Sequence, residues 1–261
     1  MKTIITTLVA IGFVCSQAIS QDKPSTYELE VKGNAAETWL IIEDMASELV
    51  IEGVSGSKIK IQAKDYKGLP AKAAGLKPLS ASGPENTGIG LHLKQEGNTI
   101  RLSAAHNEAN DAEYRIQLPK NLKLKLEYNS WQADDVLVKG MAGEIEAKSQ
   151  VGDLRFENVT GPLVAYTLSS DLEVVFSEIS SDSPTSLNST SGDIDVTIPE
   201  STKATFKMAT VSGGVYTAFD FDLGESKPNM IGGQAATGEL NGGGVEVLIK
   251  SVSGDVYIRK P

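Results

Sequence analysis

Apolar and polar residues alternate with a period of two in many short runs of the chain, and no long run after residue 20 has a helical period. Leu122, Leu124 and Leu126, for example, are interleaved with Lys123 and Lys125. This alternation is typical of strands that bury one face. Similar runs occur at 29–31, 49–51, 59–61, 194–198 and 245–249. The pattern predicts an all-β protein.

A corner motif recurs in the second half of the chain, where a turn is followed by Asp and an aliphatic residue. The copies are Gly152-Asp153-Leu154, Ser170-Asp171-Leu172, Gly192-Asp193-Ile194 and Gly254-Asp255-Val256, with weaker ones at 134–136 and 213–215. Their middle residues are separated by 18, 18, 22, 21 and 41 positions. A repeat of about 20 residues is typical of stacked supersecondary units. The last gap spans two repeats and contains Gly232-Gly233 and Gly242-Gly243-Gly244, so we expect one coil there to carry a loop.

These corners favour a β-solenoid. Gly adopts backbone conformations that are closed to other residues, and Asp hydrogen-bonds to the backbone of its own turn. Consecutive coils would stack at the strand spacing of about 4.8 Å, each burying its apolar side only against its neighbours. We therefore predict a single-stranded, parallel β-helix-like solenoid with coils of about 20 residues. A β-sandwich with Gly-Asp hairpins is the alternative, but the even gaps and the shared motif favour the solenoid.

The chain divides into three predicted parts. Residues 1–20 form a signal peptide, 21–118 a less regular N-terminal β region with a long loop at 65–90, and 119–261 the strand-repeat solenoid, continuous with it. The loop contains three prolines, and a loop of that length is either functional or mobile. Pro119 closes the strand before the repeats, because proline cannot donate to a ladder.

The N-terminus predicts export. Lys2 precedes an apolar run from Ile4 to Val14, which is too short to span a bilayer comfortably. Small residues at Ala18 and Ser20 place cleavage between Ser20 and Gln21. A lipoprotein with Cys15 as its first residue is the alternative, but bulky Phe13 and Val14 precede that cysteine. We expect a periplasmic, outer-surface or secreted protein with no transmembrane segment after the signal is removed.

Charge and cysteine content narrow the functional classes. The 261 residues carry a net charge of −10, and removal of residues 1–20 leaves 241 residues with 23 basic and 34 acidic side chains, a net charge of −11. Such a surface disfavours binding to the phosphates of nucleic acids. Cys15 leaves with the signal, so the mature chain forms no disulfide and depends on core burial and backbone hydrogen bonds.

With these features the chain resembles the bacterial putative-adhesin family of extracellular β-strand-repeat proteins, a domain of unknown function. The resemblance rests on the secretion signal, the segments 85–91 (ENTGIGL) and 114–119 (YRIQLP), and the Ser-Gly-Asp corners at 191–193 and 253–255. It covers nearly all of the mature chain. It implies a β-solenoid at the cell envelope and brings no catalytic residues.

The candidate metal and catalytic groups all have simpler interpretations. The Asp corners would line up as a column of carboxylates able to bind Ca²⁺, but Asp is also a usual turn residue that caps its own backbone. A second possible metal-binding cluster consists of Asp220, Asp222 and Glu225. Apolar residues alternate with these acids at Phe219, Phe221 and Leu223, as in a strand with one solvent-exposed face. We assign no catalytic, cofactor-binding or metal residues, and expect no cofactor.

The histidines and tryptophans also have simple structural interpretations. His92 alternates with leucines, which predicts an exposed strand residue, and His106 lies in a polar loop sequence. Neither is near a nucleophile elbow, and two isolated histidines do not support a zinc site. Trp39 and Trp131 could stack on sugars, although for Trp131 a role in capping the core is the preferred interpretation.

The sequence therefore predicts a non-enzymatic, adhesin-like scaffold or binding module whose partner is a protein or glycan of the cell envelope. The binding surface would be a coil face or the 65–90 loop. The alternative is an enzyme that degrades envelope or extracellular polysaccharide on the same scaffold, since solenoids host such enzymes. A cleft lined by convergent acids together with Lys or Arg would favour the enzyme, whereas a flat acidic face would not.

Overall fold

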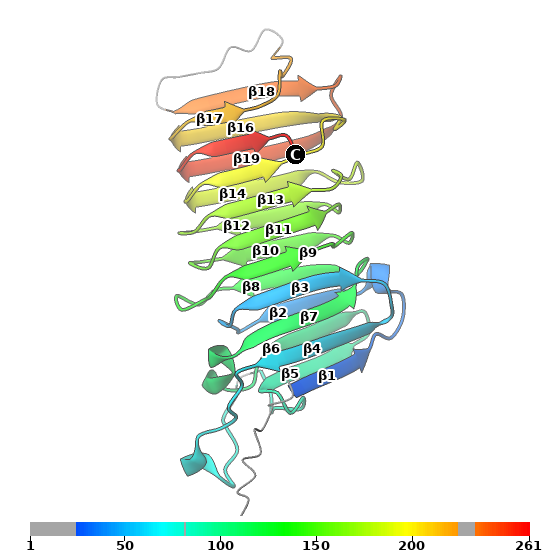
Figure 1. The fold of residues 1–261 in the computed structure, drawn as a ribbon, viewed down its shortest axis with the longest axis vertical. Helices are drawn as coiled ribbons and strands as arrows, with labels where there is room; N and C mark the ends of the chain where they lie inside the picture. The colour runs from blue at the N-terminus through cyan, green and yellow to red at the C-terminus, as the bar shows by residue number, and fades with distance from the viewer. Residues whose placement is uncertain (1–24, 81, 224–232) are drawn as a thin grey trace, which may run out of the picture.

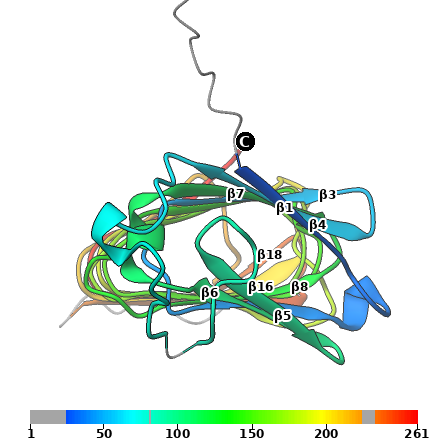
Figure 2. The ribbon, with the colours of Figure 1, turned by 90° about the horizontal axis from the view of Figure 1, so that it is seen from below.

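The computed structural model describes residues 25–80, 82–223 and 233–261, and in them nearly all regular structure is strand. The strands form two ten-stranded sheets that lie face to face along one long axis (Figure 1). Seen along that axis, the coils superpose as a flattened ring whose long sides are the two sheets (Figure 2). The all-β prediction and the β-solenoid are confirmed. Three short 3₁₀ helices lie between strands: η1 (Ala35–Glu37), η2 (Ala71–Ala73) and η3 (Asn107–Asp111).

We call the two sheets A and B. In spatial order, sheet A contains β1 (Ser25–Glu30), β4 (Lys58–Lys64), β7 (Glu113–Pro119), β3 (Leu49–Val54), β9 (Val136–Lys139), β11 (Leu154–Val159), β13 (Leu172–Phe176), β15 (Ile194–Thr197), β20 (Val256–Arg259) and β17 (Val215–Thr217). In the opposite direction along the axis, sheet B contains β18 (Gln234–Leu240), β16 (Ala204–Ser212), β19 (Val245–Ser253), β14 (Thr185–Ser191), β12 (Leu163–Thr167), β10 (Ile145–Ser149), β8 (Lys123–Tyr128), β2 (Trp39–Glu43), β6 (Thr99–Ala104) and β5 (Leu91–Glu96).

Each repeat is one coil, made of a strand in sheet B, a corner, and a strand in sheet A. Neighbouring coils pair in parallel and in register, as in Ala147 with Leu126 and Ala165, or Val174 with Phe156 and Val196. This parallel pairing excludes the β-sandwich with Gly-Asp hairpins, in which successive strands would be antiparallel. The alternate apolar residues point between the sheets and form one continuous core, which gives each short strand a buried face.

The order of the coils along the axis differs from their order in the chain at the C-terminal end. Strands β19 and β20 insert between the β14–β15 coil and the β16–β17 coil. The stretch between the corners at 214 and 255 is therefore not a coil with a loop, as the repeat spacing predicted. It contains the antiparallel edge strand β18, and then β19, which returns into the middle of the sheet. Gly232 and residues 224–231 lie outside the described residues.

At the N-terminal end both sheets continue past residue 119 into the earlier part of the chain. The β6–β7 coil lies on the outer side of the β2–β3 coil, and the antiparallel strands β1, β4 and β5 complete the two sheets. The expected loop at 65–90 follows β4 and contains η2. Its last part protects the edge strand β5, because the Asn86 side chain bonds both the N–H of Leu93, at 2.9 Å, and its carbonyl, at 2.8 Å.

Candidate functional site

The Asp corners stack in a single column on one edge of the solenoid, where sheet B strands lead into sheet A strands (the left-hand edge in Figure 1). We call this the Gly–Asp edge. One carboxylate oxygen of each Asp accepts a hydrogen bond from the backbone N–H of the corresponding residue in the adjacent coil. The bonds run from Asp153 to Asp135 (2.9 Å), Asp171 to Asp153 (3.0 Å), Asp193 to Asp171 (2.8 Å), Asp255 to Asp193 (2.8 Å) and Gly214 to Asp255 (2.7 Å).

This aspartate ladder corrects one detail of the sequence interpretation. The Asp side chains do accept backbone N–H groups, but from the next coil, not from their own turn. A side chain that bonds across coils fixes their register as well as the turn, because each backbone donor at the corner receives a partner. The ladder also follows the spatial order of the coils, with Asp255 between Asp193 and Gly214. Gly214 occupies the last position, where no further coil of this type follows.

The residue before each Asp lies very close to the neighbouring coil. A Cβ at Gly152 would lie 2.0 Å from the Asp134 carbonyl oxygen, and one at Gly192 would lie 2.2 Å from the Ser170 oxygen. Glycine is therefore required here by backbone contact. Asp134, before Asp135, and Ser170 are the exceptions in the column, and the Ser170 hydroxyl donates to the Gly152 carbonyl at 2.9 Å.

A column of buried hydroxyls lies behind the corners, and the sequence analysis missed it. Three of its members donate to corner carbonyls: Ser149 to Gly152 at 2.6 Å, Thr210 to Gly254 at 2.9 Å, and Ser251 to Gly192 at 3.3 Å. These bonds satisfy oxygens that the tight corner withdraws from water. A sequence signal was present, because Ser or Thr occurs three residues before each corner Gly or Ser. The members are Ser149, Thr167, Ser189, Thr210 and Ser251.

The charge on the ladder is not neutralised by basic side chains. On the sheet faces, acids pair with basic residues of adjacent coils, as in Arg155 with Glu173 at 2.7 Å and Lys139 with Glu157 at 2.9 Å. Among the described residues, no Lys, Arg or His forms an ion pair with any of the ladder carboxylates. Burial raises the pKa of Asp153, and the charges of Asp135 and Asp171 raise it further, against the lowering effect of the Asp171 N–H and Arg155.

The ladder geometry also bears on calcium. Ca²⁺ takes six or more oxygen ligands, whereas one oxygen of each ladder Asp already accepts a backbone N–H, and Asp255 also accepts from the Tyr257 hydroxyl at 2.9 Å. Within the described ranges, no group of three or more His, Cys, Asp or Glu residues is placed to hold a metal ion. The corner carboxylates thus have a structural use that needs no metal.

We expect thermal melts of the mature protein to superimpose with chelator, without it, and with millimolar Ca²⁺. If Ca²⁺ bridged the coils, about a 100-fold excess over its dissociation constant would add roughly 2.7 kcal/mol to the free energy of unfolding. A midpoint that falls by several degrees with chelator and is restored by Ca²⁺ would show that the corners bind metal.

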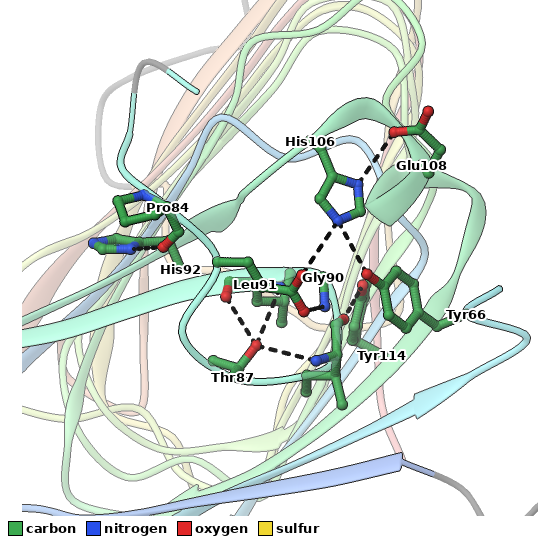
Figure 3. Close-up of polar contacts among 11 residues, drawn as sticks. Tyr66, Pro84, Thr87, Gly90, Leu91, His92, His106, Glu108 and Tyr114 are labelled. Atoms are coloured by element: carbon green, nitrogen blue, oxygen red, sulfur yellow. Dashed lines mark hydrogen bonds and ion pairs between the residues drawn. The ribbon is translucent and has the colours of Figure 1, made fainter. Parts of the chain in front are cut away.

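A second polar cluster surrounds His106 at the N-terminal end of the solenoid (Figure 3). His106 lies in the corner between β6 and β7, immediately before η3, and only 3% of its side chain is exposed. The Tyr66 hydroxyl lies 3.0 Å from Nε2, and the two rings stack with centroids 5.9 Å apart. Glu108 lies 3.2 Å from Nδ1, and Glu85 lies 3.7 Å from Nε2. The polar sequence around His106 did not predict this burial.

The segment 85–91 closes over this cluster. The Gly90 N–H donates to Glu85 at 2.7 Å, and the buried Tyr114 hydroxyl donates to the Ile89 carbonyl at 2.9 Å. His92, on β5 as predicted, has its Nδ1 2.6 Å from the Pro84 carbonyl oxygen. The cluster therefore ties the end of the 65–90 loop to the first coil.

Tyr66, His106 and Glu108 lie in the order of hydroxyl, imidazole and carboxylate, but within the described residues His106 Nδ1 makes no hydrogen bond, so Glu108 does not hold the ring as the carboxylate of a relay would. Burial raises the pKa of Tyr66 to about 12, and the charges of Glu85 and Glu108 contribute. Burial also raises the pKa of Tyr114. The Tyr66 phenol thus stays protonated at neutral pH, which is the opposite of nucleophile activation. The arrangement is suited to holding the loop.

The remaining candidates are placed as follows. Asp220 and Asp222 are exposed while Phe219 and Phe221 turn inward, as expected for one wet face, and Glu225 lies outside the described residues. The Trp39 ring is covered by the Lys123 ammonium at 5.2 Å. Trp131 is 76% exposed, so the expectation that it caps the core is wrong: the corner between β8 and β9 is long enough to turn the indole outward.

A pocket of about 440 Å³ opens at the C-terminal end, between β16, β17, β18 and residues 219–223. Its lining is mainly apolar and includes Met208, Phe219, Phe221 and Leu223, with Asp220 as its carboxylate. Glycoside hydrolysis uses two carboxyl groups that face each other across the bond. Among the described residues that line this pocket, Asp220 is the single carboxylate. No helix in the described part of the chain is long and apolar enough to cross a membrane.

Stacked parallel coils, a Gly-Asp corner in each repeat and capped ends define a two-sheet β-solenoid. The chain belongs to the Toastrack DUF4097 family, a domain family of unknown function, which matches residues 115–259. The resemblance to adhesin-like strand-repeat proteins is thereby confirmed at the level of the family.

Three solved structures align with most of the chain. A putative cell adhesion protein from Clostridium sporogenes is 15% identical, with a TM-score of 0.49 over 92% of this chain and 100% of that chain. A putative adhesin from Bacteroides fragilis is 13% identical, with a TM-score of 0.31 over 92% and 98%. A putative lipid binding protein from Parabacteroides distasonis is 11% identical, with a TM-score of 0.34 over 92% and 98%. No curated protein matches the chain.

Proposed function

We propose that the protein is an exported, non-enzymatic, adhesin-like scaffold or binding module of the bacterial cell envelope. The observation that carries this proposal is the Gly–Asp edge, where stacked corners present a long acidic surface instead of a catalytic cleft. A rigid column of coils suits binding along its length, because every coil presents an equivalent outward position. The partner is a protein or glycan of the envelope.

Two further features support a binding role over polysaccharide cleavage. The acids on the sheet faces are paired with basic side chains of adjacent coils, which leaves them poorly placed for proton transfer. The pocket at the C-terminal end has mainly apolar walls, and among its described lining residues Asp220 has no second carboxylate opposite it. The organisation that goes with this role is a signal at 1–20, an N-terminal β region at 21–118 and the strand-repeat solenoid at 119–261.

Fractionation of cells that express the native gene, combined with crosslinking before lysis, tests the proposal. We expect the mature protein in the periplasm, at the outer surface or in the medium, crosslinked to an envelope component. A cytoplasmic location would contradict the export part of the proposal. Release of sugar fragments from envelope polysaccharide by the purified protein would contradict the non-enzymatic part.

Export itself has a direct readout in the intact mass of the protein released by its native route. We expect a chain that begins at Gln21 and contains no thiol, because Cys15 is the only cysteine of the sequence. A mass that corresponds to a diacylglyceryl group on Cys15 would instead show that the protein is a lipoprotein.

A further inference from the structure

We propose that the Gly–Asp edge docks a basic protein segment that is anchored by apolar side chains. This inference rests on the proposed binding role and names the surface and the chemistry of the partner. It follows from two features of the same edge: exposed apolar side chains, and the carboxylates of the aspartate ladder.

The exposed apolar side chains are concentrated on this edge. Trp131, Val151, Leu168, Val211 and Val252, which we call the apolar ridge, all lie in or just before the corners that join sheet B to sheet A, and they are between 39% and 76% exposed. In the described ranges, the corners of the opposite edge contain no comparably exposed large apolar residue. An apolar patch of this kind, bordered by polar residues, is typical of an interaction surface.

The register of the strands places the ridge residues in neighbouring coils, with Thr190 between Leu168 and Val252. Pairing of Ser251 with Ser189 and with Thr210 places Val252 between Thr190 and Val211. Leu168 lies in the coil on the other side of Thr190. The corners from β8 to β16 belong to six successive coils, whose spacing gives the ridge a length of about 24 Å.

The charge beside the ridge selects the partner. Leu168 and Val252 precede Asp171 and Asp255 by three residues, so these two corners carry an apolar side chain on one side of the bend and a carboxylate on the other. These carboxylates form no ion pair within the described residues, unlike most acids on the faces. Lys or Arg side chains of a partner would neutralise them, and charge complementarity of this kind steers association.

The same charge disfavours the other occupants. A second copy of the mature protein would bring its own net charge of −11 and its own row of carboxylates against the edge. Anionic lipid headgroups and acidic polysaccharides would be repelled in the same way. A protein segment in which Lys or Arg alternates with apolar residues satisfies both features.

The test measures fluorescence anisotropy of labelled peptides titrated with the mature protein. Three probes of equal length are used, in which Val alternates with Lys, Val alternates with Glu, or Ser alternates with Lys. We expect the Lys–Val peptide to bind, with affinity that falls as salt rises, and the other two to bind at least tenfold more weakly. Equal binding of the Lys–Ser peptide would overturn the apolar part of the proposal, and binding of the Glu–Val peptide would overturn the electrostatic part.

Variants of the protein locate the site. Val211→Ser with Val252→Ser should weaken binding of the Lys–Val peptide by about tenfold, as expected for partly burying two such side chains. Val164→Ser, which changes an exposed valine on the outer face of sheet B, is the matched control and should leave binding unchanged. Similar affinity in the ridge variant and the control would overturn the proposal.

A second pair of variants tests the charge. Asp171→Asn with Asp193→Asn keeps an acceptor for the ladder bonds while removing two charges, and should weaken binding several-fold and reduce its salt dependence. Glu178→Gln with Asp182→Asn removes the same charge from the opposite edge, and should change neither. An equal loss of affinity in both pairs would show that the peptide is attracted by net charge alone, and would overturn the proposed site. Thermal melts of all variants confirm that they are folded.

Failure of the ridge proposal can be distinguished from failure of the proposed envelope function. If the Val211 and Val252 variant still crosslinks to the envelope component as the native protein does, the ridge proposal fails and the envelope role stands. If the native protein crosslinks to no envelope component, the envelope role fails, while the peptide titrations still decide what the edge binds.

Discussion

Replacement of Gly192 by Ala should lower the free energy of unfolding by about 3 kcal/mol or more, because the new Cβ would lie 2.2 Å from the Ser170 carbonyl oxygen of the adjacent coil. That oxygen belongs to the backbone, so relief requires two stacked coils to separate or shift. Denaturant unfolding of the mature protein measures the change, with the slope used to confirm that both proteins unfold in the same way.

Ser170→Ala is the matched control, because Ser170 occupies the same position of the corner one coil away and already carries a Cβ. This variant loses only the hydroxyl bond to the Gly152 carbonyl, for an expected cost of about 1 kcal/mol. If Gly192→Ala were no more destabilising than Ser170→Ala, the coils would not be in the close backbone contact described above.

At Asp153, replacement by Ala should destabilise the protein by about 1 kcal/mol, because the backbone N–H of Asp171 loses its side-chain acceptor. Asp153→Asn keeps an oxygen at that position and removes the charge, so at neutral pH it should be close to the native protein in stability or above it. The comparison of the two variants separates the hydrogen bond from the charge. Equal losses in both would show that the carboxylate charge itself supports the ladder.

The pH dependence of the Asn variant has a definite sign. The pKa of Asp153 is raised in the folded state, mainly by burial, so the folded protein holds this proton more tightly than the unfolded chain does. The resulting stabilisation is fully present below the ordinary aspartate pKa of about 3.9 and is lost as pH rises through the raised value. The native protein should therefore gain stability relative to Asp153→Asn as pH falls from 7 toward 4. An unchanged difference over this range would contradict the raised pKa.

The corners were predictable from the sequence because they are a local requirement repeated many times. Each coil needs a close backbone approach and an acceptor at the same position, so Gly and Asp recur at a spacing that reveals the coil length. From the sequence, each Asp was expected to accept an N–H of its own turn, because one copy of a motif can indicate only local hydrogen bonds. The bonds between coils appear only when the copies are stacked.

The order of the coils could not be obtained from the repeat. A period shows which segments are equivalent, and it leaves open which of them are neighbours. The corners at 214 and 255 are equivalent in sequence. The corner at 255 comes later in the chain, yet it lies between the corners at 193 and 214 in the solenoid. His106 was missed for a related reason: its polar neighbours Asn107 and Glu108 indicate a surface loop, whereas Tyr66 and Glu85, which bury it, lie at least 21 residues away in the chain.

The placement of β19 and β20 has a consequence for how the polypeptide acquires its structure as it is made. Solenoids whose coils stack in chain order can be completed from one end while the rest of the polypeptide is still emerging. In this protein the last strands to be synthesised supply an internal coil, between β14–β15 and β16–β17. The β16–β17 coil therefore has no native neighbour on its inner side until the C-terminus has arrived. We therefore expect assembly in chain order to reach only the β14–β15 coil, and the β16–β17 coil to be completed once β19 and β20 lie beside it.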